Sequence, residues 1–264
     1  MKSRPQRIPW SHDELVIACG LYFTLPFGQM HARNPRIIEI AGLLGRTPSS
    51  IAMKLVNFAS LDPAQRVRGI RGLAGHSHND EQVWNEFQTN WDAMALECET
   101  RLRALQDAQV TQPARSPAAE TFAVGTDAIT EAMSTIKVRI MQSFFRKAVL
   151  AAYNSTCCVT GNTIEALLVA SHILPWSEFP EERLNPSNGL CLAAHFDRAF
   201  DRGLITFDEH LRLVVSPAVR RHLPNEAIES EFLRREGWAI VCPHRFKPDP
   251  DFIAYHRVHV FRTA

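Results

Sequence analysis

Residue types that can transfer protons or bind a metal ion stand close together in the segment 170–203. His172 ends the short apolar run 167–173, and Pro175 disfavours a longer strand because proline has no amide proton to donate. A neutral histidine, with an unperturbed pKa of about 6.5, is suited to deprotonating water at physiological pH. An acid such as Asp197 can bind a divalent cation, which offsets the charge developing on a phosphate. One metal ion would suffice for this chemistry.

The surrounding pattern predicts a strand, a wide loop, a second strand and a helix. The loop Ser177–Ser187 carries two prolines and several charges, so we expect it to be solvated. Asn188 marks the return to a second apolar run, Leu190–Leu192. Ala193–Arg202 then has a helical composition, and Gly203 is well placed to end that helix. A histidine, an asparagine and an acid on a helix should therefore converge on one small surface.

Three short motifs in this segment resemble the HNH (ββα-metal) endonucleases. They are Ser-His-Ile-Leu-Pro-Trp at 171–176, Asn-Gly-Leu at 188–190 and Phe-Asp-Arg-Gly-Leu-Ile at 200–205, within a resemblance that covers about residues 145–217. The sequences of these motifs are most similar to those of the bacterial restriction-type branch that lacks zinc-binding cysteines. The resemblance implies a DNA endonuclease that uses one divalent ion, Mg²⁺ or Mn²⁺, in restriction or defence.

The same resemblance implies roles for individual residues. His172 takes the place of the general base, Asn188 that of the asparagine that fixes the loop, and Asp197 that of the metal ligand on the helix. The alternative is structural, with His172 capping a strand end and Asp197 favoured by the dipole at the helix N-terminus.

Two departures from the family pattern affect the expected metal ligands. Ser171 stands where many relatives carry an acid or a histidine as a second ligand, and Asp197 stands where many carry a histidine. His195, two residues earlier, is therefore a second candidate ligand. On the same helix, Arg198 and Arg202 are expected to contact nucleic acid.

The composition describes an ordinary soluble protein. With 264 residues, 45% of them hydrophobic and 22% charged, the chain is long enough for two domains. No apolar run approaches the roughly 20 residues of a membrane helix, and segment 1–9 lacks the apolar core of a signal peptide, so we expect a cytoplasmic protein with no membrane partner. The six cysteines form no Cys-x-x-Cys pair and are expected to be reduced and buried.

The N-terminal part suggests a helix-turn-helix arrangement. Helices are predicted from Ser11 to before Pro26, from Asn34 to Gly45, and from Thr47 onward. The short turn Gly45–Thr47 suits a helix-turn-helix, and the segment 33–71 holds seven basic residues against two acidic ones. Side chains expected to contact DNA from this unit are Arg46, Ser50, Lys54 and Asn57. Those expected to point inward from the second helix are Ile37, Ile38, Ala41 and Leu44. The alternative is a plain helical bundle.

A long helix is predicted from Asp80. Its apolar stripe comprises Trp84, Phe87, Trp91, Met94, Leu102 and Leu105. The stripe needs a partner surface, either the preceding helices or a second copy in a homodimer. Before it, the basic, glycine-containing segment 66–75 is expected to be a mobile loop able to lie along phosphates.

Together these features predict an α+β protein with three parts. They are an all-α, helix-turn-helix-like domain (1–106), a linker (107–128) and a ββα-metal HNH nuclease domain (129–264). The expected partner is double-stranded DNA. Two rival functions stay open: a nuclease acting on RNA or structured nucleic acid, and a DNA-binding regulator whose nuclease site has decayed, for which Ser171 is the supporting feature.

Overall fold

The computed structural model describes residues 8–70, 75–110 and 126–263, without the side chains of 110 and 126–136. It divides the chain into two compact units, Met1–Phe23 with Phe27–Met141 and Thr24–Pro26 with Gln142–Ala264, which are treated separately below. In the described residues no helix has both the length and the apolar character needed to cross a membrane.

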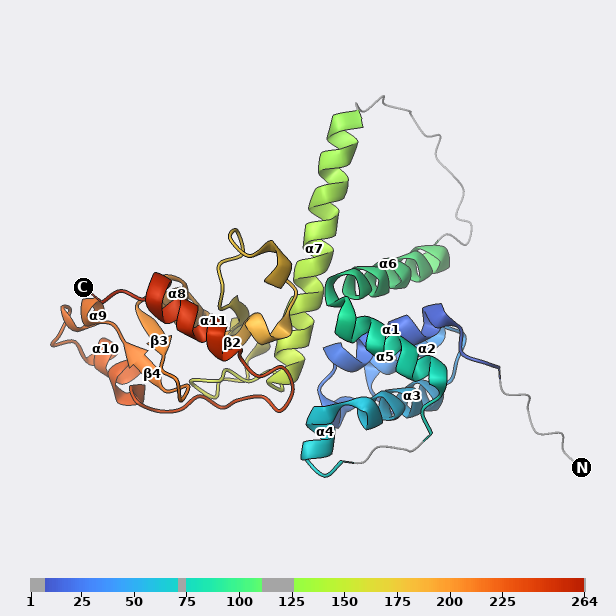
Figure 1. Cartoon of the computed structure of the whole chain (residues 1–264), viewed down its shortest axis with the longest axis horizontal. Helices are drawn as coiled ribbons and strands as arrows, with labels where there is room; N and C mark the ends of the chain where they lie inside the picture. The colour runs from blue at the N-terminus through green and yellow to red at the C-terminus, as the bar shows by residue number, and fades with distance from the viewer. Residues whose placement is uncertain (1–7, 71–74, 111–125, 264) are drawn as a thin grey trace, which may run out of the picture. The chain divides into compact units, whose positions relative to one another are not determined.

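The N-terminal unit is helical (Figure 1). Its elements are α1 (His12–Thr24), η1 (Phe27–Gln29), α2 (Pro35–Leu43), α3 (Pro48–Leu61), α4 (Pro63–Val67), α5 (His78–Thr89) and α6 (Trp91–Val110). The predicted helix starts are confirmed by their caps: Ser11 and Glu14 form a capping box, and the side chains of Asn34 and Thr47 accept backbone N–H bonds. The predicted loop 66–75 begins as the end of α4, and its residues 71–74 lie outside the described part.

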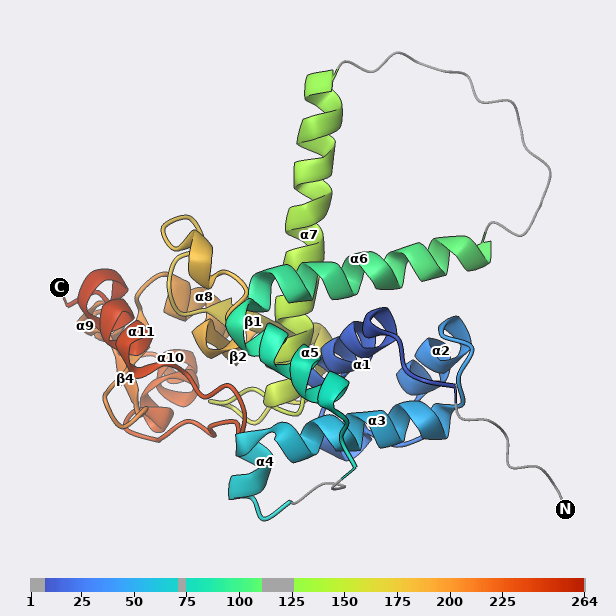
Figure 2. The same cartoon turned by 45° about the vertical axis from the view of Figure 1, so that its right-hand side comes forward.

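The aromatic residues of the predicted apolar stripe pack within this unit. Helices α5 and α6 follow one another beside α1 (Figure 2). The ring of Phe23 on α1 lies with its centroid 5.2 Å from that of Trp84, 5.3 Å from Phe87 and 4.8 Å from Trp91. The predicted long helix is two helices, because Asn90 leaves helical geometry at φ −146° and ψ 61°. Trp84, Phe87 and Trp91 therefore have a partner surface within the chain, on α1.

The prediction that Lys54 and Asn57 face outward from α3 is wrong. Lys54 and Asn57 are buried, at 7% and 9% exposure, rather than facing solvent. Lys54 Nζ lies 2.7 Å from Asp80 Oδ1, and the Asn57 amide donates to the Gly75 carbonyl. Both side chains thus hold the start of α5 against α3, while Ser50 is only partly exposed.

Two further residues of this unit, Arg46 and Ile38, are placed differently from what was expected. Arg46 donates to both carboxylate oxygens of Glu14 and to the backbone carbonyls of Ile8 and Pro9, so its guanidinium is used within the fold. Ile38 was expected inside but is 49% exposed. The face of α3 that does reach solvent bears Ser49 and Met53, which bring no positive charge.

Replacing Lys54 by methionine should destabilise the protein rather than weaken DNA binding selectively. The carboxylate of Asp80, whose side chain is fully buried, would lose its counter-charge, and breaking a buried pair in this way typically costs about 3–5 kcal/mol. Denaturant unfolding of the full chain measures the change. The control is Arg36→Met, which breaks the exposed Arg36–Glu39 pair and should cost no more than about 1 kcal/mol. Unchanged stability with reduced DNA affinity would restore Lys54 as a DNA contact.

The C-terminal unit combines short helices with two small antiparallel sheets. It includes the part of α7 (Thr126–Ala152) from Gln142 on. The elements that follow are η2 (Glu165–Leu167), β1 (Leu168–His172), η3 (Pro180–Glu182), η4 (Pro186–Asn188), β2 (Gly189–Ala193), α8 (Ala194–Asp201), β3 (Ile205–Phe207), β4 (Leu213–Val215), α9 (Pro217–Arg220), α10 (Glu226–Glu231), η5 (Leu233–Arg235), α11 (Pro250–Tyr255) and a π-helix (His256–Val260). The predicted strand, loop, strand and helix are present, and Gly203 ends α8 at φ +65° as expected. The tail from Pro217 on consists mainly of short helical segments.

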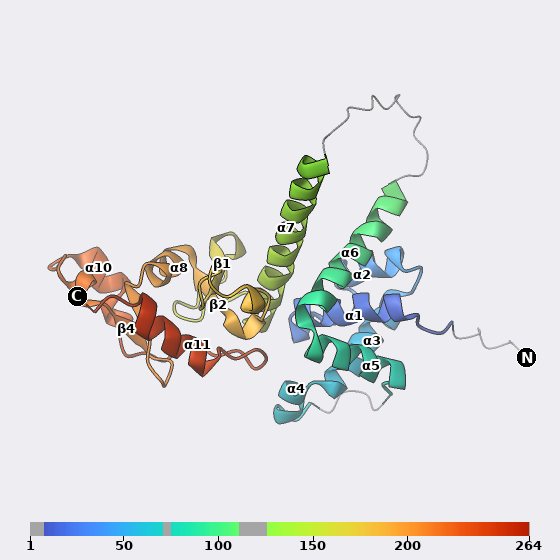
Figure 3. The same cartoon turned by 45° about the horizontal axis from the view of Figure 1, so that its top comes forward.

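The β1–β2 hairpin rests on α7 (Figure 3). The register pairs His172 with Gly189, so the ends of the two strands meet beside Asn188. A Cβ on Gly189 would lie 2.4 Å from Val149 Cγ2 and 3.0 Å from Phe145 Cζ, which explains the glycine of the Asn-Gly-Leu motif. From α7, Arg146 also donates to the Leu168 carbonyl. The long helix thus fixes the strand that carries the candidate base.

The predicted domain limits stay a prediction. Helix α6 continues to Val110 and α7 begins at Thr126, both inside the expected linker 107–128, and residues 111–125 lie outside the described part. The two compact units meet in sequence within α7, after Met141.

Five of the six cysteines are buried, and Cys242 is exposed. Cys157 Sγ accepts the backbone N–H of Ala193, just before α8. Burial raises the pKa of Cys158 well above its ordinary value and that of Cys191 to about 12, so both are neutral thiols at physiological pH. These cysteines pack the core of the nuclease-like segment.

Candidate active site

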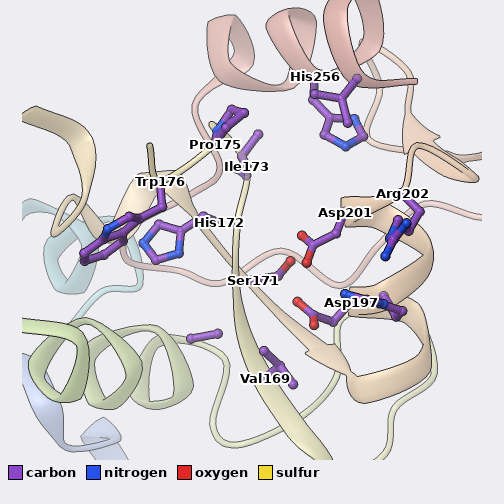
Figure 4. A pocket seen from close by; sticks show the side chains of 13 residues that line it. Val169, Ser171, His172, Ile173, Pro175, Trp176, Asp197, Asp201, Arg202 and His256 are labelled. Atoms are coloured by element: carbon purple, nitrogen blue, oxygen red, sulfur yellow. The ribbon is translucent and has the colours of Figure 1, made fainter. Parts of the chain in front are cut away.

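A pocket of about 550 Å³ opens beside β1 and α8 (Figure 4). The residues that line it come from β1 and the turn after it, from α8, and from the C-terminal π-helix: Val169, Ala170, Ser171, His172, Ile173, Pro175, Trp176, Asp197, Arg198, Asp201, Arg202, His256 and Val260. The pocket brings together His172 and Asp197 as predicted, together with both predicted arginines.

One wall of the pocket is rich in oxygen atoms. Asp197 and Asp201 are one helical turn apart on α8, and Figure 4 shows both carboxylates directed toward Ser171 on β1. Ser171 is 2% exposed, and its hydroxyl has no hydrogen-bond partner among the described residues. A buried polar group without a partner is costly, which points to a ligand absent from the protein chain itself.

These three side chains fit a hard divalent cation. Burial raises the pKa of Asp201, and the neighbouring charge of Asp197 raises it further, so the two carboxylates repel one another. A cation held by the carboxylates and the Ser171 hydroxyl would relieve this repulsion, and oxygen ligands suit Mg²⁺ and similar ions. No three histidine, cysteine or acidic side chains converge on a metal position in the part of the chain that the structure describes. The remaining ligands would be water and substrate.

His172 points to the opposite side of β1, as the alternation of side chains along a strand requires (Figure 4). Its ring stacks on Phe145, with centroids 3.9 Å apart and an angle of 10° between the planes, and meets the ring of Trp176 edge-on. Nε2 lies 2.9 Å from the carbonyl oxygen of Arg183, so Nε2 carries the proton and donates it. In the neutral ring, Nδ1 then keeps a lone pair that can accept a proton.

Burial lowers the pKa of His172 below its ordinary value of 6.5, against smaller opposing effects of the Arg183 carbonyl and the charge of Asp197. The ring is therefore neutral at physiological pH, which is the form a general base requires.

Asn188 fixes the loop that holds this ring. It is 1% exposed; its Oδ1 accepts the Leu174 N–H at 2.8 Å, and its Nδ2 donates to the Glu182 carbonyl at 3.0 Å. Glu182 precedes Arg183, whose carbonyl accepts from His172. Asn188 thus connects β2 to the loop whose Arg183 carbonyl contacts His172.

The strand, loop, strand and helix that carry these residues coincide with a known family. The HNH endonuclease family model matches residues 157–208. These residues form an HNH domain. No curated protein matches the chain. The match spans β1, β2 and α8 with His172, Asn188, Asp197 and Asp201, and it ends at β3.

The structure places His195, a predicted ligand candidate, away from the pocket. His195 does not line the pocket, and its Nε2 lies 3.1 Å from Glu231 Oε2 on α10. Two residues along a helix turn the side chain by roughly 200°, so His195 and Asp197 cannot share a ligand position on one face. Asp201, which the sequence interpretation missed, shares that face because it follows Asp197 by four residues. The spacing alone was the signal that could have found it.

The basic residues of α8 are where they were expected. Arg198 and Arg202 are exposed and line the pocket beside the two acids. Arg183 does not line the pocket, but its guanidinium lies 4.9 Å from the ring centroid of Trp176, which does, and its Nε donates to the Trp176 carbonyl. The HNH domain therefore places positive charge beside its two acids.

Proposed function

We propose that this chain is a metal-dependent DNA endonuclease whose HNH domain hydrolyses phosphodiester bonds. The single observation that carries the proposal is the buried, unpartnered Ser171 hydroxyl facing Asp197 and Asp201 across the pocket. A regulator with a decayed site would have no need to keep two repelling carboxylates around such a group. In the sequence, Ser171 was the feature that favoured a decayed nuclease site. Its buried hydroxyl beside the two acids instead supports an intact one.

Each residue of the candidate site has a separate role in the proposed reaction. His172 accepts a proton at Nδ1 from the attacking water, and the Arg183 carbonyl holds the ring in that tautomer. Arg198 and Arg202 bind the phosphate, and Asn188 keeps the base-holding loop in place. A divalent ion on Asp197, Asp201 and Ser171 would stabilise negative charge on the phosphate and the leaving oxygen. The two acids and His172 lie on opposite sides of β1. The phosphate would therefore bind in the part of the pocket that the acids and His172 both line.

DNA is the proposed substrate, Mg²⁺ or Mn²⁺ the proposed ion, and restriction or defence the proposed role. These follow from the resemblance of the motifs at 171–176, 188–190 and 200–205 to restriction-type nucleases. The proposed compartment is the cytoplasm.

Incubation of supercoiled plasmid DNA with the full chain tests the proposal. We expect nicked and linear products with Mg²⁺ or Mn²⁺ and intact plasmid with EDTA. A structured RNA of similar length, run in parallel, distinguishes the first rival, because faster cleavage of RNA would make it the substrate. DNA binding without cleavage in either ion would favour the regulator instead.

A further inference from the structure

The C-terminal segment Asp249–Arg262 lies outside the family match, yet it contacts both halves of the candidate site. Two of its residues, His256 and Val260, line the pocket. It forms α11 and then a π-helix, an uncommon conformation that often occurs at functional sites.

His256 is bound to the last turn of α8. Its ring lies parallel to that of Phe200, with centroids 3.6 Å apart and planes 4° from parallel. Nε2 donates to the Phe200 carbonyl at 3.1 Å, and Nδ1 accepts from the Thr206 hydroxyl at 2.9 Å. His256 is 2% exposed, and both ring nitrogens are used, so it cannot act as a base itself. Its contacts instead fix Phe200, the residue next to Asp201.

The backbone after His256 closes on the end of α8. A Cβ on Gly203 would lie 2.0 Å from the Val260 carbonyl oxygen, so only glycine allows this approach. Arg262 N–H donates to the Gly203 carbonyl at 2.9 Å, and Arg262 O accepts from the Ser216 hydroxyl. The end of the helix that carries Asp201 is thus enclosed by chain that the family match does not include.

The start of the same segment is attached to the loop 177–187. The Tyr255 hydroxyl donates to Glu178 Oε2 at 2.9 Å, and its ring meets that of Phe179 edge-on. Asp249 N–H donates to the Ser187 carbonyl at 3.1 Å. This loop also contains Arg183, whose carbonyl orients His172. Adjacent residues of the segment, Tyr255 and His256, therefore contact the base side and the carboxylate side respectively.

We propose that His256 is a positioning residue of the nuclease site, which holds the last turn of α8 so that Asp201 is aimed with Asp197 at the metal position. This inference rests on the proposed function, because it assumes that the two acids bind a divalent ion. His256 acts through the Phe200 carbonyl and through ring stacking, and it touches neither substrate nor ion.

Calorimetric titration of the full chain with Mn²⁺ tests this role without requiring activity. In His256→Phe the ring stack on Phe200 can persist, but both hydrogen bonds are lost. We expect the Kd for Mn²⁺ to rise roughly 10-fold, at the lower end of the loss seen when partners of metal ligands are removed. Cleavage should fall at limiting Mn²⁺ and recover at saturating Mn²⁺.

Tyr255→Phe is the matched control, since it alters the neighbouring residue and its loop contact but leaves α8 untouched; its Kd should equal that of the wild type. Thr206→Val removes only the hydroxyl partner of His256 and should weaken Mn²⁺ binding in the same direction, so it decides the matter if His256→Phe does not fold. Wild-type affinity in the folded variants would overturn the role of His256 and leave the proposed function standing. A wild-type protein that binds no Mn²⁺ would instead remove the metal site, and this inference with it.

Discussion

His172→Ala should lower single-turnover DNA cleavage by a factor of about 10² to 10⁴, the usual contribution of a positioned general base. DNA affinity should stay at the wild-type value, because His172 acts only in the chemical step. The reason lies in its surroundings: Nε2 donates to the Arg183 carbonyl, the ring is stacked on Phe145, and Nδ1 is left to accept a proton. Cleavage assays under saturating protein, with a parallel filter-binding assay, measure both quantities.

The pH dependence adds a second readout for His172. Burial lowers the pKa of this ring, and the base works only when unprotonated, so the rate should rise with pH with its midpoint below about 6.5, the ordinary histidine value. His210→Ala is the control, because His210 is exposed on the turn between β3 and β4, away from the pocket. Near wild-type cleavage by His172→Ala would exclude it as the base.

Local signals in the sequence predicted the parts of the fold that depend on local chemistry. The caps Ser11, Asn34 and Thr47 start helices where expected, and Gly203 ends α8, because these residues act on backbone groups a few positions away. The strand, loop, strand and helix of the HNH domain followed from short motifs of the same kind. Such motifs carry position and residue type together, which is why the family was recognisable.

Features set by tertiary contacts could not be predicted in this way. Helical spacing placed Lys54 and Asn57 outside, but Asp80, 26 positions after Lys54, draws the lysine into a buried ion pair. His195 looked like a ligand because histidine binds metals, but the direction of α8 turns it toward Glu231. His256, 56 positions beyond Phe200, has no signal in the sequence at all, because its role exists only once the C-terminal segment folds back.

The metal position gives the second large prediction. Replacing Asp197 and Asp201 together by asparagine should abolish cleavage and weaken Mn²⁺ binding by at least about 100-fold, more than the loss of an outer partner costs. A neutral amide is a poorer ligand for a hard cation than a carboxylate, and the remaining Ser171 hydroxyl carries no charge. Titration calorimetry and cleavage on the same preparations test both effects. His195→Ala, on the same helix but paired with Glu231, is the matched control and should keep both activities.

Thermal unfolding distinguishes the loss of metal ligands from damage to the fold. Damage to the fold would lower the Tm without metal, whereas the loss of the two carboxylates should not. Burial and Asp197 raise the pKa of Asp201 above its unfolded value, so the ionised carboxylate disfavours the folded state at neutral pH. Without metal, the double variant should therefore melt at or above the wild-type temperature. Mn²⁺ should raise the Tm of the wild type, since a ligand that binds only the folded state stabilises it, and should leave the variant unchanged. A variant that keeps the Mn²⁺-dependent shift, or a His195→Ala protein that loses it, would move the metal ligands away from Asp197 and Asp201.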